Sequence, residues 1–237
     1  MTSLVRVAAA IVLFLSMAGV ASAHHLWLEV DGQGARIYFG EFGENLREAS
    51  PGSLDRLQPQ AKVVSSSGER PLTVEKKANA FAASGKIDAT DSVVAEDVRY
   101  PVFVRTQGGA TTRSIYWPAA RFVPDRTARP AVLELDVVPA GGDRFVVSFK
   151  GKPLAKAKVS VTTPSGWARE FHTGEDGGFE AGLPWRGAYV LEVQHADKTP
   201  GKRGDDAYDQ VNYVTSLTVV QPQGIEPLPA LPPAKPH

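Results

Sequence analysis

The sequence predicts an all-β protein built from two β-sandwich units in tandem, the second of the immunoglobulin or transthyretin type. Three observations lead to this fold class. Apolar and polar residues alternate along short runs, helical periodicity is scarce, and Gly and Pro are abundant, at 22 and 18 of 237 residues. Short alternating runs separated by turn residues are typical of sandwiches and barrels, whereas helices need apolar residues three or four positions apart.

Residues 1–23 have the features of a secretory signal peptide. Arg6 precedes an apolar run over 7–20, and Ala21-Ser22-Ala23 follows as a small-x-small cleavage site. The apolar run is short for a membrane span, and no later run approaches that length. We therefore expect a periplasmic or secreted protein, cleaved after Ala23 and without a membrane span after processing. A retained N-terminal anchor is the alternative.

Charge and cysteine content narrow the function classes. Lys+Arg and Asp+Glu both number 26, so the chain has no general attraction for nucleic acid or for an anionic membrane. The sequence contains no cysteine, which excludes disulfides, thiol nucleophiles and iron–sulfur clusters. Any metal must be held by histidine, carboxylate, amine or backbone groups.

The first β unit is expected over residues 24–123. It begins with a strand in which His25, Trp27 and Glu29 alternate with aliphatic residues, so these three side chains share one face of the strand. A Gly-containing turn at 31–34 leads into a second strand and predicts a hairpin.

Residues 41–58 are expected to form a long irregular connection with one helical turn near 53–57, because charges, Gly and Pro interrupt its apolar residues. Short alternating runs resume after it. Further strands of the first unit are expected at 61–65, 72–75, 78–84, 92–96, 101–105 and 112–117.

The second unit is expected over residues 143–221, as an immunoglobulin- or transthyretin-like sandwich. Residues 124–142 are assigned to a linker or connecting strand because their first part is polar and flanked by proline. A charged loop is expected at 196–209, and the Pro-rich residues 222–237 are expected to be an extended, flexible tail. Strands are expected at 145–149, 157–162, 167–172, 187–193 and 213–220.

Two parts of the chain together resemble a known family. One is the strand His24-x-x-Trp27-x-Glu29, directly after the predicted signal peptide. The other is the series Gly-Lys-Pro-Leu-x-x-Ala-x-Val at 151–159, Asp-Gly at 176–177, Gly-x-Tyr at 187–189 and Ser-Leu-Thr at 216–218. The chain resembles the NikM-like family of exported domains of unknown function, with a carboxypeptidase-regulatory or transthyretin-like C-terminal sandwich.

Some members of that family are periplasmic accessory components of nickel or cobalt uptake. The resemblance therefore implies a metal-handling accessory whose partners are transporter components of the cell envelope. It also implies nickel or cobalt as the metal. Only the leading histidine of the family is carried over, onto His24 or His25, and not a complete ligand set.

Cleavage after Ala23 would make His24 and His25 the first two residues. An N-terminal histidine offers its amine and imidazole to one metal ion. An Xaa-His terminus can instead use the amine, the His25 amide nitrogen and the His25 imidazole. Nitrogen-rich sites of either kind suit Ni(II) or Cu(II), so copper is an alternative metal. The candidate ligands are His24 and His25, with Glu29 on the face of His25 and His195 as a more distant addition.

Three function classes remain. The first is an exported, non-catalytic transition-metal-binding accessory of nickel or cobalt uptake or of metal handling. The second is an envelope interaction or adhesion module without metal. The third is a copper enzyme of the histidine-brace type, which needs an internal histidine on the same face, and only His172 and His195 are available. Because the chain has no nucleophile elbow, His-Glu-x-x-His or phosphate loop, we expect a protein that is not an enzyme.

Overall fold

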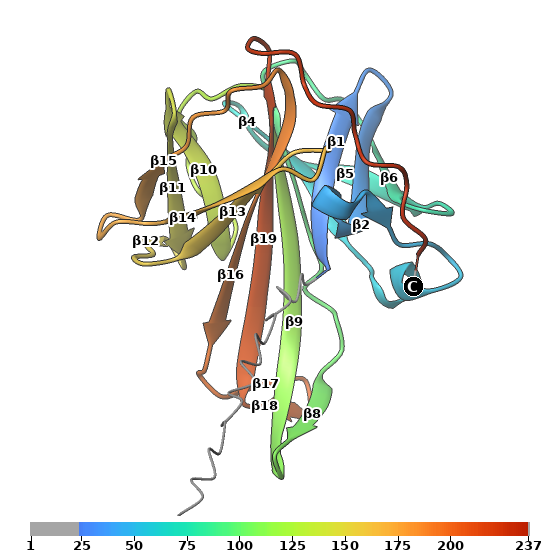
Figure 1. Cartoon of the computed structure of the whole chain (residues 1–237). Helices are drawn as coiled ribbons and strands as arrows, with labels where there is room; N and C mark the ends of the chain where they lie inside the picture. The colour runs from blue at the N-terminus through green and yellow to red at the C-terminus, as the bar shows by residue number, and fades with distance from the viewer. Residues whose placement is uncertain (1–23, 237) are drawn as a thin grey trace, which may run out of the picture.

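The computed structural model describes residues 24–236; the predicted signal peptide and His237 lie outside them. The described chain consists of strands β1–β19, two short 3-10 helices and their connections (Figure 1). The prediction of an all-β fold is confirmed. No helix within residues 24–236 is long and apolar enough to cross a membrane.

The first half of the chain contains nine strands and both 3-10 helices. Their bounds are β1 (His25–Asp31), β2 (Gly34–Glu41), η1 (Phe42–Glu44), β3 (Leu46–Arg47), η2 (Ser53–Arg56), β4 (Gln60–Ser65), β5 (Gly68–Lys76), β6 (Phe81–Ser84), β7 (Ser92–Glu96), β8 (Phe103–Gln107) and β9 (Ala110–Val123). The helical turn expected near 53–57 is present as η2.

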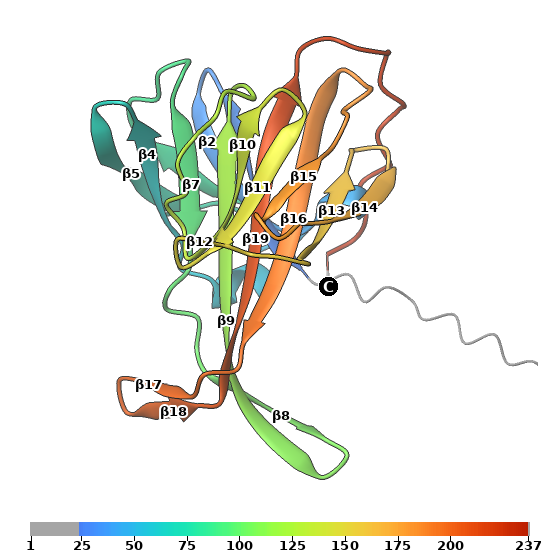
Figure 2. The same cartoon turned by 90° about the vertical axis from the view of Figure 1, so that its left-hand side faces the viewer.

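The second half contains the other ten strands. Their bounds are β10 (Leu135–Gly141), β11 (Arg144–Phe149), β12 (Lys152–Pro153), β13 (Lys158–Thr162), β14 (Ala168–His172), β15 (Gly178–Glu180), β16 (Gly187–Asp197), β17 (Gly201–Arg203), β18 (Asp206–Tyr208) and β19 (Gln210–Gln221). The residues expected to form a charged loop at 196–209 thus contain a small hairpin, β17–β18. It projects from the same end of the body as β8 (Figure 2).

One mixed sheet of thirteen strands runs through the molecule. Its order is β1-β2-β6-β5-β4-β7-β9-β19-β16-β13-β14, with β3 paired to β2 and β8 paired to β9. The pair β9–β19 is parallel, and the other pairs in this sheet are antiparallel. The first part of the sheet curls until β1 lies against β9 and β19 (Figure 1). This curl brings the start of the described chain to the middle of the molecule.

A second sheet, β10-β11-β12 with β15, covers the C-terminal part of the large sheet (Figure 2). The core between these sheets includes the fully buried Phe145, Tyr189 and Leu217. The Thr215 hydroxyl also donates a hydrogen bond of 2.7 Å to the Leu135 carbonyl across this core. Two apolar inner faces packed in this way make a β-sandwich.

Strand β9 belongs to both halves of the molecule. Ile115 and Val123 pack in the C-terminal core, while Ala120 and Phe122 pack in the N-terminal core. Alternate side chains of one strand point to opposite faces, so β9 can serve two cores at once. The range 124–142, expected to be a linker or connecting strand, contains β10, a strand of the second sheet.

A buried ion pair joins β9 to β10. The guanidinium of Arg121 binds the carboxylate of Asp136 through two bonds, of 3.0 Å from Nε and 2.6 Å from Nη2. Asp136 Oδ2 also accepts hydrogen bonds from the backbone N–H groups of Val132 and Leu133. Both charged side chains are almost fully excluded from solvent. Arg121 Nη2 also donates to the Pro130 carbonyl at 3.3 Å, so each buried charge is stabilised by the other and by polar contacts with the backbone.

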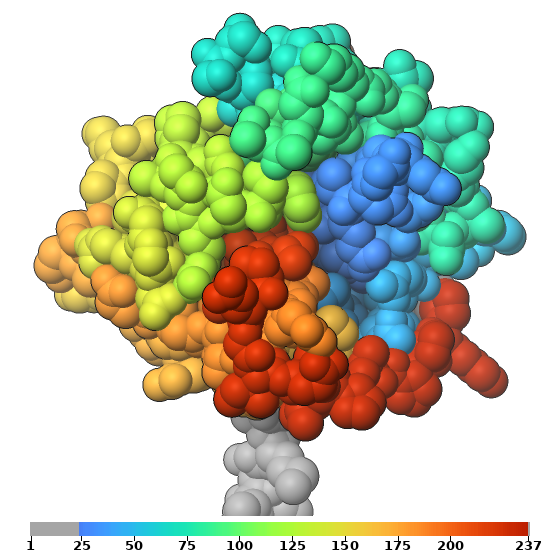
Figure 3. Space-filling view, turned by 90° about the horizontal axis from the view of Figure 1, so that it is seen from above, coloured from blue at the N-terminus to red at the C-terminus, as the bar shows by residue number. Residues whose placement is uncertain are grey.

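The C-terminal segment at 222–236 is extended, as the sequence predicts, and it lies along the surface of the molecule (Figure 3). The Leu231 N–H donates to the Pro164 carbonyl at 2.9 Å, and the Ala234 N–H donates to the Asn45 carbonyl at 3.1 Å. The Asn45 side chain in turn donates to the Leu231 carbonyl. The segment therefore contacts both halves of the molecule, which its Pro-rich composition did not indicate.

Candidate functional site

The two adjacent histidines at the start of the described chain point to opposite faces of the sheet. Leu26 and Leu28 alternate with Trp27 along β1, and both sets are buried, in different apolar clusters. His24 lies on the side of the leucines, next to the ring of Phe39. His25 lies on the side of Trp27 and is also buried. The two imidazoles therefore have separate surroundings.

The imidazole of His24 lies between two carboxylates. Its Nε2 is 2.6 Å from Glu48 Oε1, and its Nδ1 is 3.5 Å from Glu41 Oε1. Glu41 ends β2 and Glu48 follows β3, and these two strands pair next to β1. The Glu48 side chain is 0% exposed, whereas the imidazole is 26% exposed. The histidine ring thus connects a buried carboxylate to a partly exposed one.

The partners of His24 indicate which ring nitrogen carries the proton. A carboxylate accepts hydrogen bonds, so we assign the proton to Nε2, which then donates to Glu48 in the shorter of the two contacts. The remaining nitrogen, Nδ1, faces Glu41. In metal sites, a carboxylate on one nitrogen of a histidine orients the ring and makes the other nitrogen a better ligand.

The backbone of His24 is also held in place. The Tyr116 hydroxyl, from β9, donates a hydrogen bond of 2.6 Å to the His24 carbonyl. Burial raises the pKa of Tyr116 well above its ordinary value, so this hydroxyl remains a donor over the whole physiological range. Two residues further, the Ser216 hydroxyl from β19 donates to the Leu26 carbonyl at 2.5 Å.

His25 faces a different acidic residue. Its Nδ1 is 3.0 Å from Glu192 Oε2 on β16. Burial by itself raises the pKa of Glu192, but the charge and hydrogen bond of His25, the hydrogen bond of Gln194 and the charge of Lys158 together outweigh it, and the pKa is lowered. Gln194 donates a further hydrogen bond of 2.7 Å to the same carboxylate. The pair of His25 and Glu192 joins β1 to the C-terminal half of the molecule.

The other two candidate ligands lie apart from these groups. Glu29 accepts a hydrogen bond from Trp27 Nε1 at 3.2 Å and pairs with Arg47 at 3.0 Å. His195 packs its ring against Phe149 with centroids 4.4 Å apart, and burial lowers its pKa. It is three residues from Glu192 along β16 and therefore points to the opposite face of that strand. The structure does not bring His195 to the start of the chain.

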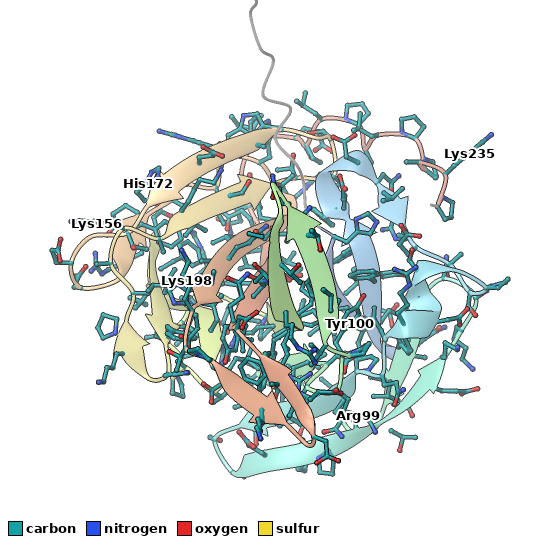
Figure 4. The ribbon with its side chains drawn as sticks, turned by 90° about the horizontal axis from the view of Figure 1, so that it is seen from below. Arg99, Tyr100, Lys156, His172, Lys198 and Lys235 are labelled. Carbon is teal, nitrogen blue, oxygen red and sulfur yellow. The ribbon has the colours of Figure 1, made fainter. Side chains whose placement is uncertain are left out.

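The histidine that a copper enzyme of the brace type would need is also distant. His172 ends β14 and is exposed, at the edge of the large sheet. Figure 4 places it across the molecule from the blue N-terminal strands. Neither His172 nor His195 can therefore complete a brace with His24.

Within residues 24–236, no three His, Asp or Glu side chains gather in an arrangement that could hold a metal ion. A metal at His24 would need a donor that is not a side chain. Two ligands each about 2.1 Å from one ion lie about 3–3.4 Å apart, close to the separation of His24 Nδ1 and Glu41 Oε1, which is 3.5 Å. These two groups fit one metal ion if a third donor, such as an α-amine on His24, is added.

The comparisons with known proteins give no relative. No protein-family model, curated protein or solved structure matches the chain. The function must therefore be argued from the residues and their geometry.

Sequence reasoning did not select Glu41, Glu48 or Glu192. The first two lie in or next to the segment that was expected to be an irregular connection, and such long segments often carry functional residues. Glu192 lies in a predicted strand, on the face opposite its apolar residues. Nothing local in the sequence indicates that all three approach the histidines, because the contacts depend on how β2, β3 and β16 pack around β1.

The lowered pKa of Glu192 gives a prediction about acid stability. Above the ordinary pKa of a glutamate, about 4.3, the carboxylate stabilises the fold through His25, so Glu192→Gln should unfold at lower denaturant concentration than the wild type. As the pH falls through the lowered folded-state pKa, the unfolded state binds more protons and this contribution is lost. The difference between the two proteins should therefore shrink below pH 4.3. Urea unfolding from pH 7 to pH 3 measures it, and a constant difference would contradict the pairing.

Proposed function

We propose that this protein is an exported, non-catalytic transition-metal-binding accessory of metal uptake or handling, and that the metal binds at His24 once the leader has been removed after Ala23. The ligands are the α-amine and Nδ1 of His24, which form one chelate ring, and the carboxylate of Glu41. Glu48 orients the imidazole. The observation that carries the proposal is the 2.6 Å contact between Glu48 and His24 Nε2, because it directs Nδ1 toward Glu41.

The surroundings of His24 support a fixed terminus. Tyr116 holds the His24 carbonyl, and β2 pairs with β1 up to His25. A ligand set that is already in position loses little conformational freedom when the metal binds, which raises affinity. A histidine at a frayed chain end would not have this advantage.

The donor set restricts the metal. Two nitrogens and one carboxylate oxygen, with no sulfur, suit Ni(II), Co(II) and Cu(II), and affinity rises in the order cobalt, nickel, copper. The resemblance of the sequence to nickel- and cobalt-uptake accessories favours nickel or cobalt as the physiological cargo, with transporter components of the envelope as partners. Copper is the alternative where it is available.

Titration of the mature protein with Ni(II), Co(II) and Cu(II) tests the proposal. The chain is purified from the periplasm, and its mass must correspond to a start at His24. The matched control carries one Gln before His24, which cyclises to pyroglutamate and leaves no free amine. We expect one metal ion per chain, with affinity reduced by more than about tenfold in the capped protein because the chelate ring is lost.

Equal affinity in the two proteins would overturn the assignment of the amine as a ligand. Absence of binding by all three metals, with the correct mass, would exclude metal handling. It would favour an envelope interaction module, for which the structure offers one feature: Phe103 and Val104 on the projecting strand β8 are 38% and 59% exposed.

A further inference from the structure

A cavity of about 520 Å³ lies beside the candidate metal site. One wall is formed by His25, Glu41 and the η1 turn, from the N-terminal half of the molecule. The other wall is formed by strands β13, β14 and β16, from the C-terminal half. Glu41 both lines this cavity and faces His24. Ligand pockets often occur where two units of a protein meet in this way.

Close backbone contacts form one end of the cavity. Gly43, in η1, approaches β13 so closely that a Cβ there would lie 2.6 Å from Thr162 Cγ2. An ideal Cβ on Gly166 would lie 3.2 Å from the Gly43 carbonyl oxygen and 2.9 Å from the Leu231 side chain of the C-terminal segment. Three segments that are distant in sequence therefore meet here.

The size of the cavity exceeds what a metal ion needs. An ion bound by His24 and Glu41 occupies only the space between its ligands, whereas organic ligands use cavities of about 300–1,000 Å³. The cavity at 520 Å³ falls inside that range. A molecule of several non-hydrogen atoms would fill it, next to the metal.

The lining carries charges of both signs. Glu41, Glu44, Glu170 and Glu192 are acidic, while Lys158 supplies positive charge from β13. Lys158 is paired with Glu170 at 2.6 Å, but both side chains are about half exposed, so the pair is weak and can exchange for a ligand group. Such a lining is complementary to a molecule that itself carries an ammonium and a carboxylate group.

We infer that this cavity binds a small aminocarboxylate, a molecule of the amino-acid class. Its carboxylate pairs with Lys158, and its ammonium group meets Glu44 and Glu192. A second part of the inference rests on the proposed function: when a metal ion is held by His24 and Glu41, donor atoms of the aminocarboxylate complete the coordination, so that metal and ligand bind together.

Calorimetric titration with L-histidine tests the first part without any metal. The protein is the pyroglutamate-capped form, which cannot form the amine chelate, so the result does not depend on the proposed metal site. We expect saturable binding of one L-histidine per chain. Citrate, which has no amine, and imidazole, which has no carboxylate, should bind at least about tenfold more weakly because each lacks one of the two charges.

Two variants locate the binding. Ser160 points from β13 into the cavity, and Ser160→Phe should fill it and weaken L-histidine binding by at least about tenfold. Thr73→Phe introduces the same side chain at an exposed position of β5 and should bind as the wild type does. Lys158→Glu reverses a lining charge without filling space, and it should weaken binding too. Circular dichroism confirms that each variant is folded.

The second part is tested by repeating the titration on the uncapped mature protein, with and without Ni(II). L-histidine should bind more tightly to the nickel-loaded protein. If the metal-free capped protein does not bind L-histidine, or if Ser160→Phe and Lys158→Glu bind it as the wild type does, the cavity assignment is wrong, whatever the metal titrations show. If L-histidine binds but no metal does, the cavity assignment stands and the proposed function fails.

Discussion

Asp136→Ala is expected to lower the free energy of unfolding by about 3–5 kcal/mol, because it leaves the guanidinium of Arg121 buried without its counter-charge. The substitution removes four hydrogen bonds at once: two that Asp136 accepts from Arg121 and two that it accepts from backbone N–H groups. Since these bonds tie β9 to β10, the change also loosens the contact between the two sheets of the C-terminal sandwich.

The double variant Arg121→Met with Asp136→Leu provides the control. It removes both charges and keeps most of the volume, so it should recover a large part of the stability that Asp136→Ala loses. Denaturant unfolding of the three proteins measures this difference. If the double variant is at least as unstable as Asp136→Ala, the loss is due to the shape of the side chains and not to an uncompensated buried charge.

Glu48→Gln is expected to weaken metal binding at His24 by about 10–100-fold, the usual effect of altering a group that orients a metal ligand. Glutamine keeps the size of the side chain but removes the negative charge that holds the proton on Nε2. Its amide can also donate to the ring, which favours the other tautomer and places a proton on Nδ1. The metal must then compete with that proton.

Glu29→Gln is the matched control, because Glu29 belongs to the same half of the molecule but is bound to Trp27 and Arg47. It should leave the metal affinity unchanged. The measurement is the Ni(II) titration of the mature protein, with unfolding curves recorded to verify that both variants are folded. If both variants lose the same amount of Ni(II) affinity, then either the metal binds elsewhere or the loss reflects only the change in the net charge of the protein.

The sequence was sufficient for the fold class and for most strands, because alternation of polar and apolar residues is a local property. It was insufficient where a strand is buried on both faces. The alternation in β1 correctly separates His25 and Trp27 from the leucines, but the second face is buried as well, against side chains that include Val190 of β16. That contact depends on the curl of the large sheet, which no local pattern specifies.

The candidate site was predictable only in part. The position of His24 and His25 next to the predicted cleavage site made both of them candidate ligands, and the structure gives the ring of His24 two carboxylate neighbours. Glu48 could not be selected, since a glutamate in an irregular segment is usually exposed and this one is fully buried. His195 was included among the candidate metal ligands because the end of its strand could face the start of the chain. Its packing against Phe149 instead follows from the direction of side chains along β16.

The sharing of β9 between two cores has a consequence for how such a protein can change over evolutionary time. Units joined by a linker can be duplicated, exchanged or lost separately, because each keeps its own core. Here Val123 and Phe122 are neighbours in the chain but belong to different cores. No cut near this point leaves both halves complete, so we expect the two units to be inherited as one and insertions to occur at the projecting hairpins rather than between the halves.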